Sequence, residues 1–392
     1  MSVSTTALAP ARVDLRSMSR LSLGHMFVDM CQGCVPALLP TLIATRGLNL
    51  ASATALVSIA TIGSAVVQPL FGIWSDRISA PLLAPVGIAL AGLGLSAVGL
   101  CHSYLALALA LALSGLGVAL FHPEGARMAD LVGGGSVRGM SYFSVGGNAG
   151  FALGPLLVLA ILATGGLSAT PLVAIPGLLV ATLLLLDVGR LKRHAHATRS
   201  RRQARAGAGA PEWAPFTRLV GAAVARTVPF YGLMAFIPIY AIRTLGASHS
   251  VGSLALTVML VGGAFGTLVG GRCADRFGKR PVLVWAMIPL TALLLILPHA
   301  GLPVMFGLLV LVGFALDFPF STTVVLGQQY LPGRRGLASG VTFGLAIGAG
   351  GLLATGLGVV ADAIGIHGTL ELLPIFSAVA LACVLSLPDP RA

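Results

Sequence analysis

Long apolar stretches alternate with short polar ones along almost the whole chain, and this alternation predicts membrane-spanning helices. One example is LALALALALSGLGVAL at residues 105–120, a run of sixteen residues without a charge. Each such stretch approaches the ~20 residues that an α-helix needs to cross the hydrocarbon core of a bilayer. We expect twelve spans, at roughly 21–43, 51–73, 82–101, 104–126, 140–163, 169–188, 219–242, 250–271, 281–299, 303–328, 337–360 and 368–387.

The composition excludes a water-soluble domain. Hydrophobic residues make up 56% of the 392 residues and charged residues only 9%, too few to cover a soluble surface of this size. The first twenty residues contain no apolar core ahead of a cleavage site, so we expect the first span to remain in the protein as an anchor. The fold class that follows is an all-α integral membrane protein.

Basic residues are distributed very unequally between the two sides of the predicted spans. Of the 24 Lys and Arg residues, 21 fall on the side that carries both termini. The opposite loops hold only Arg46 and Arg243, and Arg226 lies inside a span. This positive-inside pattern predicts that both termini are cytoplasmic. The net charge of +12 therefore reflects topology and gives no reason to expect a nucleic-acid partner.

Three short motifs occur twice in the same order, and their spacing indicates an internal duplication. GIWSDR matches GRCADR at an offset of 199 residues, GVALFHP matches GFALDFP at 196, and RGMS matches RGLAS at 197. A repeat that holds its spacing predicts two pseudo-symmetric six-helix bundles. The expected organisation is a cytoplasmic segment (1–20), a first bundle (21–188), a basic cytoplasmic linker (189–217), a second bundle (218–387) and a short cytoplasmic tail (388–392).

The linker between the bundles is rich in basic residues, Ala and Gly, and has no apolar face. Its simplest interpretation is a plain connection. Contact with anionic lipid headgroups is a secondary role that such a basic segment can take.

These features resemble the plan of the major facilitator superfamily of transporters. GGRCADRFGKR matches that superfamily's Gly-x-x-x-Asp-Arg-x-Gly-Arg/Lys-Arg signature in full, whereas GIWSDRISAPL lacks the trailing Gly and basic pair. Within the superfamily, several stretches from residue 24 to about 340 resemble the fosmidomycin resistance protein family: GHMFVDMCQG, QPLFGIWSD, FHPEGARMA, VGGNAGFALGPLL, ARTVPFYGLMAFIPIY and VVLGQQYLPGRRGLASG. The resemblance implies the major facilitator fold and a place in a bacterial cytoplasmic (inner) membrane.

Several polar residues are predicted to lie inside spans, where each charged side chain costs about 2.5–3.5 kcal/mol. His25 and Asp29 are four residues apart and Gln32 follows three later, so the three stack on one helix face. Such a stripe predicts a face that lines a cavity. In the seventh span Arg226 would offer an anion-binding charge, and in the tenth Asp317 is a further carboxylate on the path.

The segment FHPEGAR near the end of the fourth span allows two interpretations. Glu124 and Arg127 are three residues apart, so they either line the transport path and its inner gate or form a structural ion pair at the inner membrane edge. Pro123 removes a backbone donor and should bend the helix there. His122 lies about 160° round the helix from Glu124, and a hydrogen bond to a neighbouring helix is its simplest role.

The two copies of Gly-x-x-x-Asp-Arg fall at cytoplasmic helix ends. A carboxylate there is stabilised by the free N–H groups at the amino end of a facing helix. The resemblance implies that the motif latches the inner side of the transporter; the alternative is that its arginines only set topology. The first copy comprises Gly72, Asp76 and Arg77, and the second comprises Gly271, Asp275, Arg276, Gly278, Lys279 and Arg280.

Glycines spaced by four predict close helix packing. Gly146, Gly150 and Gly154 share one face of the fifth span and precede Pro155. Residues 262–270 and 340–348 contain similar sets. GFALGP resembles the span-five motif of drug/proton antiporters in the superfamily but lacks its trailing glycine, and packing alone would also explain the glycines.

Five cysteines and eight histidines show no spacing typical of a disulfide framework or a metal site. Cys31 and Cys34 form a CQGC, but at mid-span their simplest role is that of small packing residues. No phosphate loop or nucleophile–base arrangement is present either. We therefore predict no cofactor, no metal and no enzymatic activity.

The resulting hypothesis is a secondary active transporter that exports a small organic molecule or drug in exchange for protons, by alternating access between its halves. Asp29 and Glu124 are the candidate proton carriers. The main alternative is a proton-coupled importer, or symporter, on the same fold; a non-transporting sensor is less favoured because the short loops leave no room for a signalling module. The expected partners are the substrate, protons and the bilayer, and we expect a monomer.

Overall fold

The computed structural model describes residues 13–78, 81–194 and 210–388, which are almost entirely helical and contain no strand. The first half holds α1 (Leu15–Arg46), α2 (Leu50–Ile78), α3 (Leu83–Ala97), α4 (Tyr104–Val132), α5 (Val137–Gly165) and α6 (Ala174–Leu185). The second half holds α8 (Trp213–Arg243), α9 (His249–Phe277), α10 (Lys279–Ile296), α11 (Leu302–Asp317), α12 (Phe320–Tyr330), α13 (Arg335–Ser339) and α14 (Ala346–Leu385).

Short non-α segments connect or interrupt these helices. Three are 3₁₀ turns: η1 (Val98–Leu100), η2 (Gly166–Val173) and η3 (Leu297–His299). The fourth, η4 (Gly340–Leu345), is a π-helical segment between α13 and α14. Pro319 separates α11 from α12, whereas α4 continues through Pro123, the proline at the matching place in the first half.

The duplication is visible in the backbone as well as in the motifs. Glycines with positive φ occur in pairs 199 residues apart: Gly47 with Gly246, Gly134 with Gly333, and Gly166 with Gly365. Residues other than glycine avoid this conformation because their Cβ clashes with the backbone. The turns therefore fall at the same places in both halves, which is what two copies of one six-helix plan require.

Ten helical stretches of the described residues are long and apolar enough to cross a membrane. Eight of them run for 18–32 residues. The other two, Val137–Leu185 and Arg335–Leu385, are 49 and 51 residues long, far more than one crossing needs. Each of the two contains one of the positive-φ glycines, Gly166 in the first and Gly365 in the second. The described residues therefore contain ten such stretches where the sequence predicted twelve spans.

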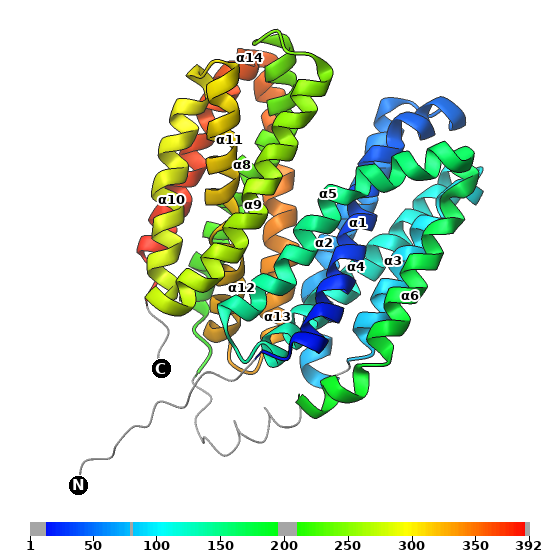
Figure 1. Ribbon diagram of the computed structural model, residues 1–392, viewed down its shortest axis with the longest axis vertical. Helices are drawn as coiled ribbons and strands as arrows, with labels where there is room; N and C mark the ends of the chain where they lie inside the picture. The colour runs from blue at the N-terminus through cyan, green and yellow to red at the C-terminus, as the bar shows by residue number, and fades with distance from the viewer. Residues whose placement is uncertain (1–12, 79–80, 195–209, 389–392) are drawn as a thin grey trace.

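The two halves lie side by side and meet most closely at one end (Figure 1). We call this the closed end; α1 begins there and α14 ends there. Between the halves α2 contacts α13, and α5 contacts α9. These are the same contact made twice, because α9 is the second-half copy of α2 and α13 is the copy of α5. Toward the opposite end the halves draw apart.

The outer surface is apolar and the interior carries the polar groups, the reverse of a soluble protein. Leu105, Leu109, Leu159, Leu186 and Val359 are all more than 60% exposed. Hydrocarbon chains are a suitable solvent for such side chains. Several charged or titratable side chains of the spans are instead buried between helices: His25, His122, Glu124, Arg127, Arg226 and Asp317.

Two element boundaries differ from the sequence expectation. α1 begins at Leu15, inside the expected amino-terminal segment, and α8 begins at Trp213, inside the expected linker. The Asp14 side chain caps the start of α1 by accepting from the Ser17 amide, and Pro215 lies in the first turn of α8, where proline is tolerated. Most of the linker, residues 195–209, lies outside the described residues.

Candidate functional site

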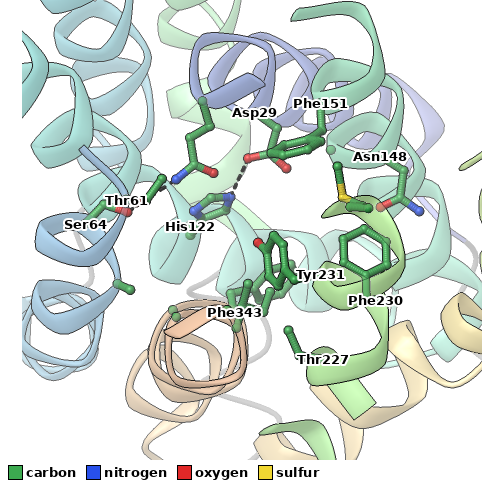
Figure 2. A pocket seen from close by; sticks show the side chains of 18 of the residues that line it. Asp29, Thr61, Ser64, His122, Asn148, Phe151, Thr227, Phe230, Tyr231 and Phe343 are labelled. Atoms are coloured by element: carbon green, nitrogen blue, oxygen red, sulfur yellow. Dashed lines mark hydrogen bonds and ion pairs between the residues drawn. The ribbon is translucent and has the colours of Figure 1, made fainter. Parts of the chain in front are cut away.

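A cavity of about 470 Å³ lies between the two halves. α1, α2, α4 and α5 supply one wall, and α8, α9, α11, α12 and the η4–α14 segment supply the other. Figure 2 shows Asp29 and His122 of the first half facing Phe230 and Tyr231 of the second. Six of the sequence-predicted residues line it: His25, Asp29, Gln32, His122, Arg226 and Asp317.

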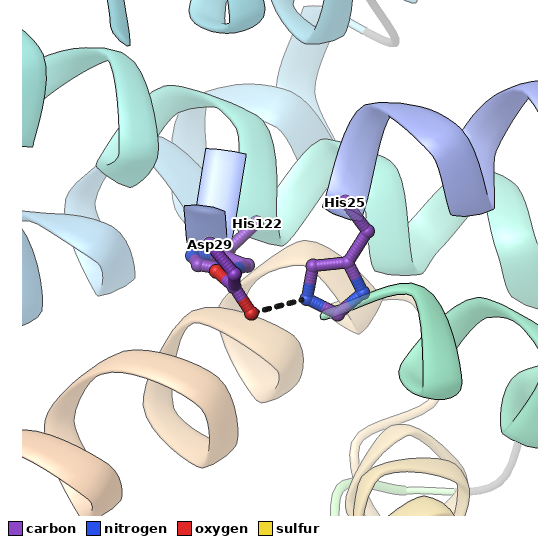
Figure 3. A group of neighbouring side chains, drawn as sticks. All are labelled: His25, Asp29 and His122. Atoms are coloured by element: carbon purple, nitrogen blue, oxygen red, sulfur yellow. Dashed lines mark hydrogen bonds and ion pairs between the residues drawn. The ribbon is translucent and has the colours of Figure 1, made fainter. Parts of the chain in front are cut away.

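Asp29 sits between two imidazoles at the inner part of this cavity (Figure 3). Its Oδ1 lies 3.0 Å from His122 Nε2, and its Oδ2 lies 3.3 Å from His25 Nε2. Both histidines are almost completely buried, while the Asp29 side chain keeps 16% exposure. The carboxylate is therefore the member of this group that the cavity can reach.

The hydrogen bonds of His25 determine where a proton can sit. His25 Nδ1 lies 2.9 Å from the backbone oxygen of Phe143, which can only accept, so Nδ1 carries a hydrogen. A neutral His25 then turns the bare lone pair of Nε2 toward Asp29 Oδ2. Two lone pairs at 3.3 Å repel each other unless a proton lies between them, on the imidazole or on the carboxyl group. The geometry thus contains a place for one exchangeable proton.

Aromatic rings surround the imidazoles and join them to the second half. His25 stacks on Phe143 with ring centroids 4.2 Å apart, and His122 stacks on Phe343 at 5.6 Å with the planes nearly parallel. Phe343 belongs to the π-helical segment η4 of the second half. Segments of π-helix are rare and frequently occur at functional sites. His25 and His122, the two imidazoles beside Asp29, are therefore in direct contact with a residue of the second half.

Arg226 and Asp317 form a second charged pair on the opposite wall. Arg226 Nη1 donates to the backbone oxygen of Leu316 at 2.7 Å and lies 3.4 Å from Asp317 Oδ1, and the guanidinium stands 5.5 Å from the Phe320 ring centroid. Arg226 Nε is buried and has no hydrogen-bond partner among the described residues. The charge of Arg226 is thus partly compensated by its own half, and its guanidinium keeps donor capacity.

Glu124 and Arg127 form a buried pair that is not among the cavity-lining residues. Arg127 Nη2 lies 2.7 Å from Glu124 Oε1, and Arg127 Nε lies 3.0 Å from Oε2 and 3.1 Å from the hydroxyl of Ser75. Glu124 is completely buried and also accepts from Ser75. Since Ser75 belongs to α2, this network ties α4 to α2.

The closed end is held by two carboxylates that accept hydrogen bonds from backbone amides. Asp275, at the end of α9, accepts from the first two amides of α5, Val137 and Arg138, at 2.8 and 2.9 Å. Asp76, at the end of α2, accepts from Gly336 and Leu337 at the start of α13, at 2.7 and 2.9 Å. Each contact crosses from one half to the other, and each uses the positive end of a helix dipole.

The remaining residues of the two motif copies shape the helix ends. Gly72 lies so close to the Gly336 backbone that a Cβ would collide with it, and Gly271 packs in the same way against Ser141. Gly278 has a φ of 95°, which ends α9 and lets Lys279 begin α10. Arg280 donates to the Leu385 backbone oxygen at 2.8 Å, Arg276 lies over the Phe277 ring, and Arg77 is exposed.

The glycines of α5 bring its backbone against that of α1. A Cβ at Gly146 or Gly150 would overlap the backbone oxygens of Ser22 and Met26, and one at Gly154 would collide with Gly33 and Cys34. Cys34 donates from Sγ to the Gly154 backbone oxygen at 3.3 Å. This packing holds the helix that carries His25 and Asp29 against α5. α5 itself continues through Pro155.

The comparisons with known proteins agree with this architecture. Residues 21–242 and 219–392 match the family model described as Major Facilitator Superfamily. The chain belongs to the major facilitator superfamily. It is a membrane transporter by family, and the members of this family are transporters, not enzymes.

Two curated relatives of this transporter cover most of its length. One is the "Fosmidomycin resistance protein" of Escherichia coli K12, 32% identical over 376 residues that make up 92% of this chain and 89% of the relative. The other is the "Uncharacterized MFS-type transporter YfnC" of Bacillus subtilis 168, 32% identical over 359 residues, 88% of this chain and 86% of the relative. The resemblance to the fosmidomycin resistance family inferred from the motifs is thereby confirmed.

Solved structures share the fold of this transporter. The E. coli fucose:proton symporter FucP superposes with a TM-score of 0.74 and covers 96% of this chain and 100% of its own, at 16% identity. The proton:xylose symporter XylE gives a TM-score of 0.75, covers 96% of each chain and is also 16% identical. At this identity the likeness concerns the fold.

Some residues of the site escaped the sequence analysis. Phe343 and Tyr231 line the cavity, and Asn148 donates to Thr267 at 3.1 Å across the halves. Asp130 forms an ion pair with Arg335, again between the halves. Asp130 and Arg335 are 205 positions apart, so no local spacing signals the pair; the only available sign was a carboxylate one helical turn beyond Arg127.

Two groups of histidine and carboxylate side chains became complete only in the structure. His25, Asp29 and His122 form one, and His299, His367 and Glu371 form the other; in each, the nitrogen and oxygen atoms lie within 4.8 Å of one another. Two members of each group are four residues apart on one helix, and the third comes from a distant part of the chain. The prediction that no metal is bound was drawn from spacing alone, which does not show the third member.

Proposed function

We propose that this transporter exports a small organic molecule in exchange for protons, and that Asp29 carries the proton. The observation that supports the proposal most directly is the position of Asp29, between two buried imidazoles and open to a cavity that both halves line. A carboxylate in this position can gain or lose the proton that the contact between His25 Nε2 and Asp29 Oδ2 needs. The name of the E. coli relative favours export of a toxic compound.

The proposed topology has twelve crossings with both termini in the cytoplasm of a bacterial inner membrane. The stretches Val137–Leu185 and Arg335–Leu385 would each cross twice, with their turns at Gly166 and Gly365. The excess of Lys and Arg on the side of the termini supports a cytoplasmic position for the closed end. The cavity would then open outward in this structure. One chain supplies both walls, so we propose that a monomer suffices.

Through Phe343, a proton bound in the Asp29 group could change how the two halves pack against each other. Its ring packs on His122 and, edge-on, on His25, so a change in the charge of either imidazole alters a contact between the halves. Substrate bound near Asp29 and a proton bound on it would then favour different arrangements of η4. Alternating access requires such a differential interaction.

Glu124, in this proposal, is structural. Its buried pair with Arg127 and Ser75 leaves it no access to the described cavity. We further propose that Arg226 and its partner Asp317, which line the opposite wall, contact the substrate there, and that the positive charge of Arg226 attracts an acidic group.

The test is transport in proteoliposomes under an imposed pH gradient, with fosmidomycin as the first compound because of the relative's name and a pH-sensitive dye as readout. Asp29→Asn resembles the protonated carboxyl, so uphill transport should be lost while downhill exchange of substrate is retained. Glu124→Gln is the matched control: this variant should be less stable, and its substrate exchange should fall as a result. Undiminished uphill transport in Asp29→Asn, Glu124→Gln and the double variant would exclude both carboxylates as coupling sites.

The direction of transport distinguishes the exporter from the main alternative, an importer. A proton-coupled importer on this fold would use the same Asp29 group, and the pH dye would then show protons and substrate moving the same way. Opposite movement supports the exporter. Binding of the compound without any proton or substrate flux would favour a sensor instead.

A further inference from the structure

A cluster of His299, His367 and Glu371 lies at the end of the second half opposite the closed end. His299 is the last residue of η3, which follows α10, and the other two residues lie on α14 just beyond the break at Gly365. Glu371 Oε1 is 3.2 Å from His367 Nε2 and 3.7 Å from His299 Nε2. The imidazole rings are 5.5 Å apart. The transport proposal makes no use of this group.

The tautomer of His367 follows from Tyr240. The Tyr240 hydroxyl lies 2.5 Å from the backbone oxygen of Pro298, which takes its only hydrogen. His367 Nδ1, 3.4 Å from the same hydroxyl, must then donate to the tyrosine oxygen. In neutral His367 the lone pair is therefore on Nε2 and points at the carboxylate of Glu371. A hydrogen bond on the distal nitrogen is also what orients a metal-binding histidine.

The distances suit a tetrahedral metal ion. Two ligand atoms that each lie about 2.0–2.1 Å from zinc are roughly 3.3 Å from each other in that geometry. The 3.2 and 3.7 Å separations are close to this value. Side-chain exposures of 61% for His299 and 46% for His367 and Glu371 leave room for water as a fourth ligand.

The first half has no counterpart of this group. The duplication holds an offset of 199 residues in this region, because Gly166 pairs with Gly365 and η1 pairs with η3. His367 then corresponds to Ser168, Glu371 to Leu172 and His299 to Leu100. Two imidazoles and a carboxylate thus stand where the first half has one hydroxyl and two leucines.

From this geometry we infer that His299, His367 and Glu371 bind one divalent transition-metal ion of the zinc class. Two imidazoles and one carboxylate form a donor set that suits zinc, nickel and copper and disfavours magnesium and calcium. The ion would join the α10–α11 connection to the last helix. Because all three ligands belong to one half, the ion would stabilise that half and would not lock the two halves together.

The test is a titration of the purified, tag-free protein with Co²⁺, whose visible absorption reports the ligand geometry, followed by displacement with Zn²⁺. One equivalent should bind. His299→Ala, His367→Ala and Glu371→Gln should each weaken binding at least tenfold. The matched controls are His102→Ala, which changes an exposed histidine of the first half, and Asp29→Asn in the cavity, and both should bind as the unaltered protein does.

Stability and transport give a second, independent readout. Zn²⁺ should raise the temperature of unfolding of the unaltered protein and of His102→Ala, since a ligand that binds only the folded state stabilises it, but not that of His367→Ala. Substrate exchange should be unchanged by Zn²⁺. Binding that survives in a His299→Ala, His367→Ala double variant, or that is lost in Asp29→Asn, would overturn the assignment.

Discussion

At the scale of single residues, the Asp29 group is tightly enclosed by its neighbours. Gly147 of α5 lies against it, and a Cβ there would come within 2.5 Å of Asp29 Oδ2 and 2.6 Å of His25 Nε2. Glycine at this position leaves the space that the carboxylate and imidazole occupy. The contact between Asp29 and His25 therefore depends on Gly147, a residue that has no side chain to take part in it.

We expect Gly147→Ala to reduce uphill transport by roughly tenfold or more, equivalent to about 1.4 kcal/mol in the barrier, because the carboxylate must move away from His25. Thermal unfolding should change little. Gly63→Ala is the control, since a Cβ at Gly63 meets nothing within 4 Å. Full pH-driven transport in Gly147→Ala would show that the spacing of Asp29 and His25 does not matter for coupling.

The Glu124–Arg127 pair gives a prediction about stability. Removing one member of a buried, hydrogen-bonded ion pair typically costs about 3–5 kcal/mol because the other charge is left unpaired. Arg127→Met should therefore lower the unfolding temperature strongly. Arg127→Met combined with Glu124→Leu should recover part of the loss. Equal stability of the single variant and the unaltered protein, by thermal unfolding in detergent, would contradict the structural role.

At the scale of elements, the contacts of α9 with α5 and of α2 with α13 hold the closed end. Both depend on a carboxylate that receives two backbone amides. We expect Asp275→Asn to lower transport strongly without changing the amount of protein in the membrane, and Asp76→Asn to do the same. Asp362→Asn, on α14 near the opposite end, is the control. Spectroscopic distances between labels on α5 and α9 at the closed end should lengthen in the first two variants only.

The start of α1 is joined to the segment that follows α6 by an ion pair outside the membrane-spanning stretches. Asp14 accepts from Arg190 Nε at 2.6 Å and Nη2 at 3.0 Å. Burial opposes the charged form, but the hydrogen bonds from Arg190 and Ser17 outweigh it and hold the pKa of Asp14 below its ordinary 3.8. Because the pKa is lower in the folded state, the ionised Asp14 stabilises the fold fully at any pH above the ordinary pKa. This stabilisation is lost as the pH falls below that value.

Asp14→Asn should accordingly lower the unfolding temperature at pH 7. The difference from the unaltered protein should stay constant down to about pH 4.5 and shrink below that. Thermal unfolding at a series of pH values measures it. A difference that grows as the pH falls would have the wrong sign for this pair.

At the scale of the whole molecule, the sequence predicted the all-helical major facilitator fold, and it predicted the contacts of the site only in part. The positions of the spans and the duplication follow from apolar length and repeat spacing, which are local properties. His25, Asp29 and Gln32 were found because one helix face carries all three. The contact of Asp29 with His122, and that of His122 with Phe343, depend on how three helices pack, and no pattern within one helix contains that information.

Orientation in the membrane belongs to this scale too. In a variant without the five native cysteines, a cysteine at Ser248 should react with impermeant thiol reagents added to intact cells, and one at Ser200, outside the described residues, should not. The 21 basic residues on one side are the physical reason. The reverse labelling pattern would invert the topology and with it the assignment of the closed end to the cytoplasm.

The hydrogen bonds of Asp76 and Asp275 have a consequence for how this family can diverge. Both carboxylates bind main-chain amides, which every residue except proline supplies. The facing positions Val137, Arg138 and Leu337 can thus accept many substitutions without loss of the contact, whereas Gly336 cannot, because a Cβ there would collide with the Gly72 backbone oxygen. Pairwise covariation among homologues should therefore be weak at these two junctions, although they bring the halves together, and strong at Asp130 and Arg335, where one side chain needs the other.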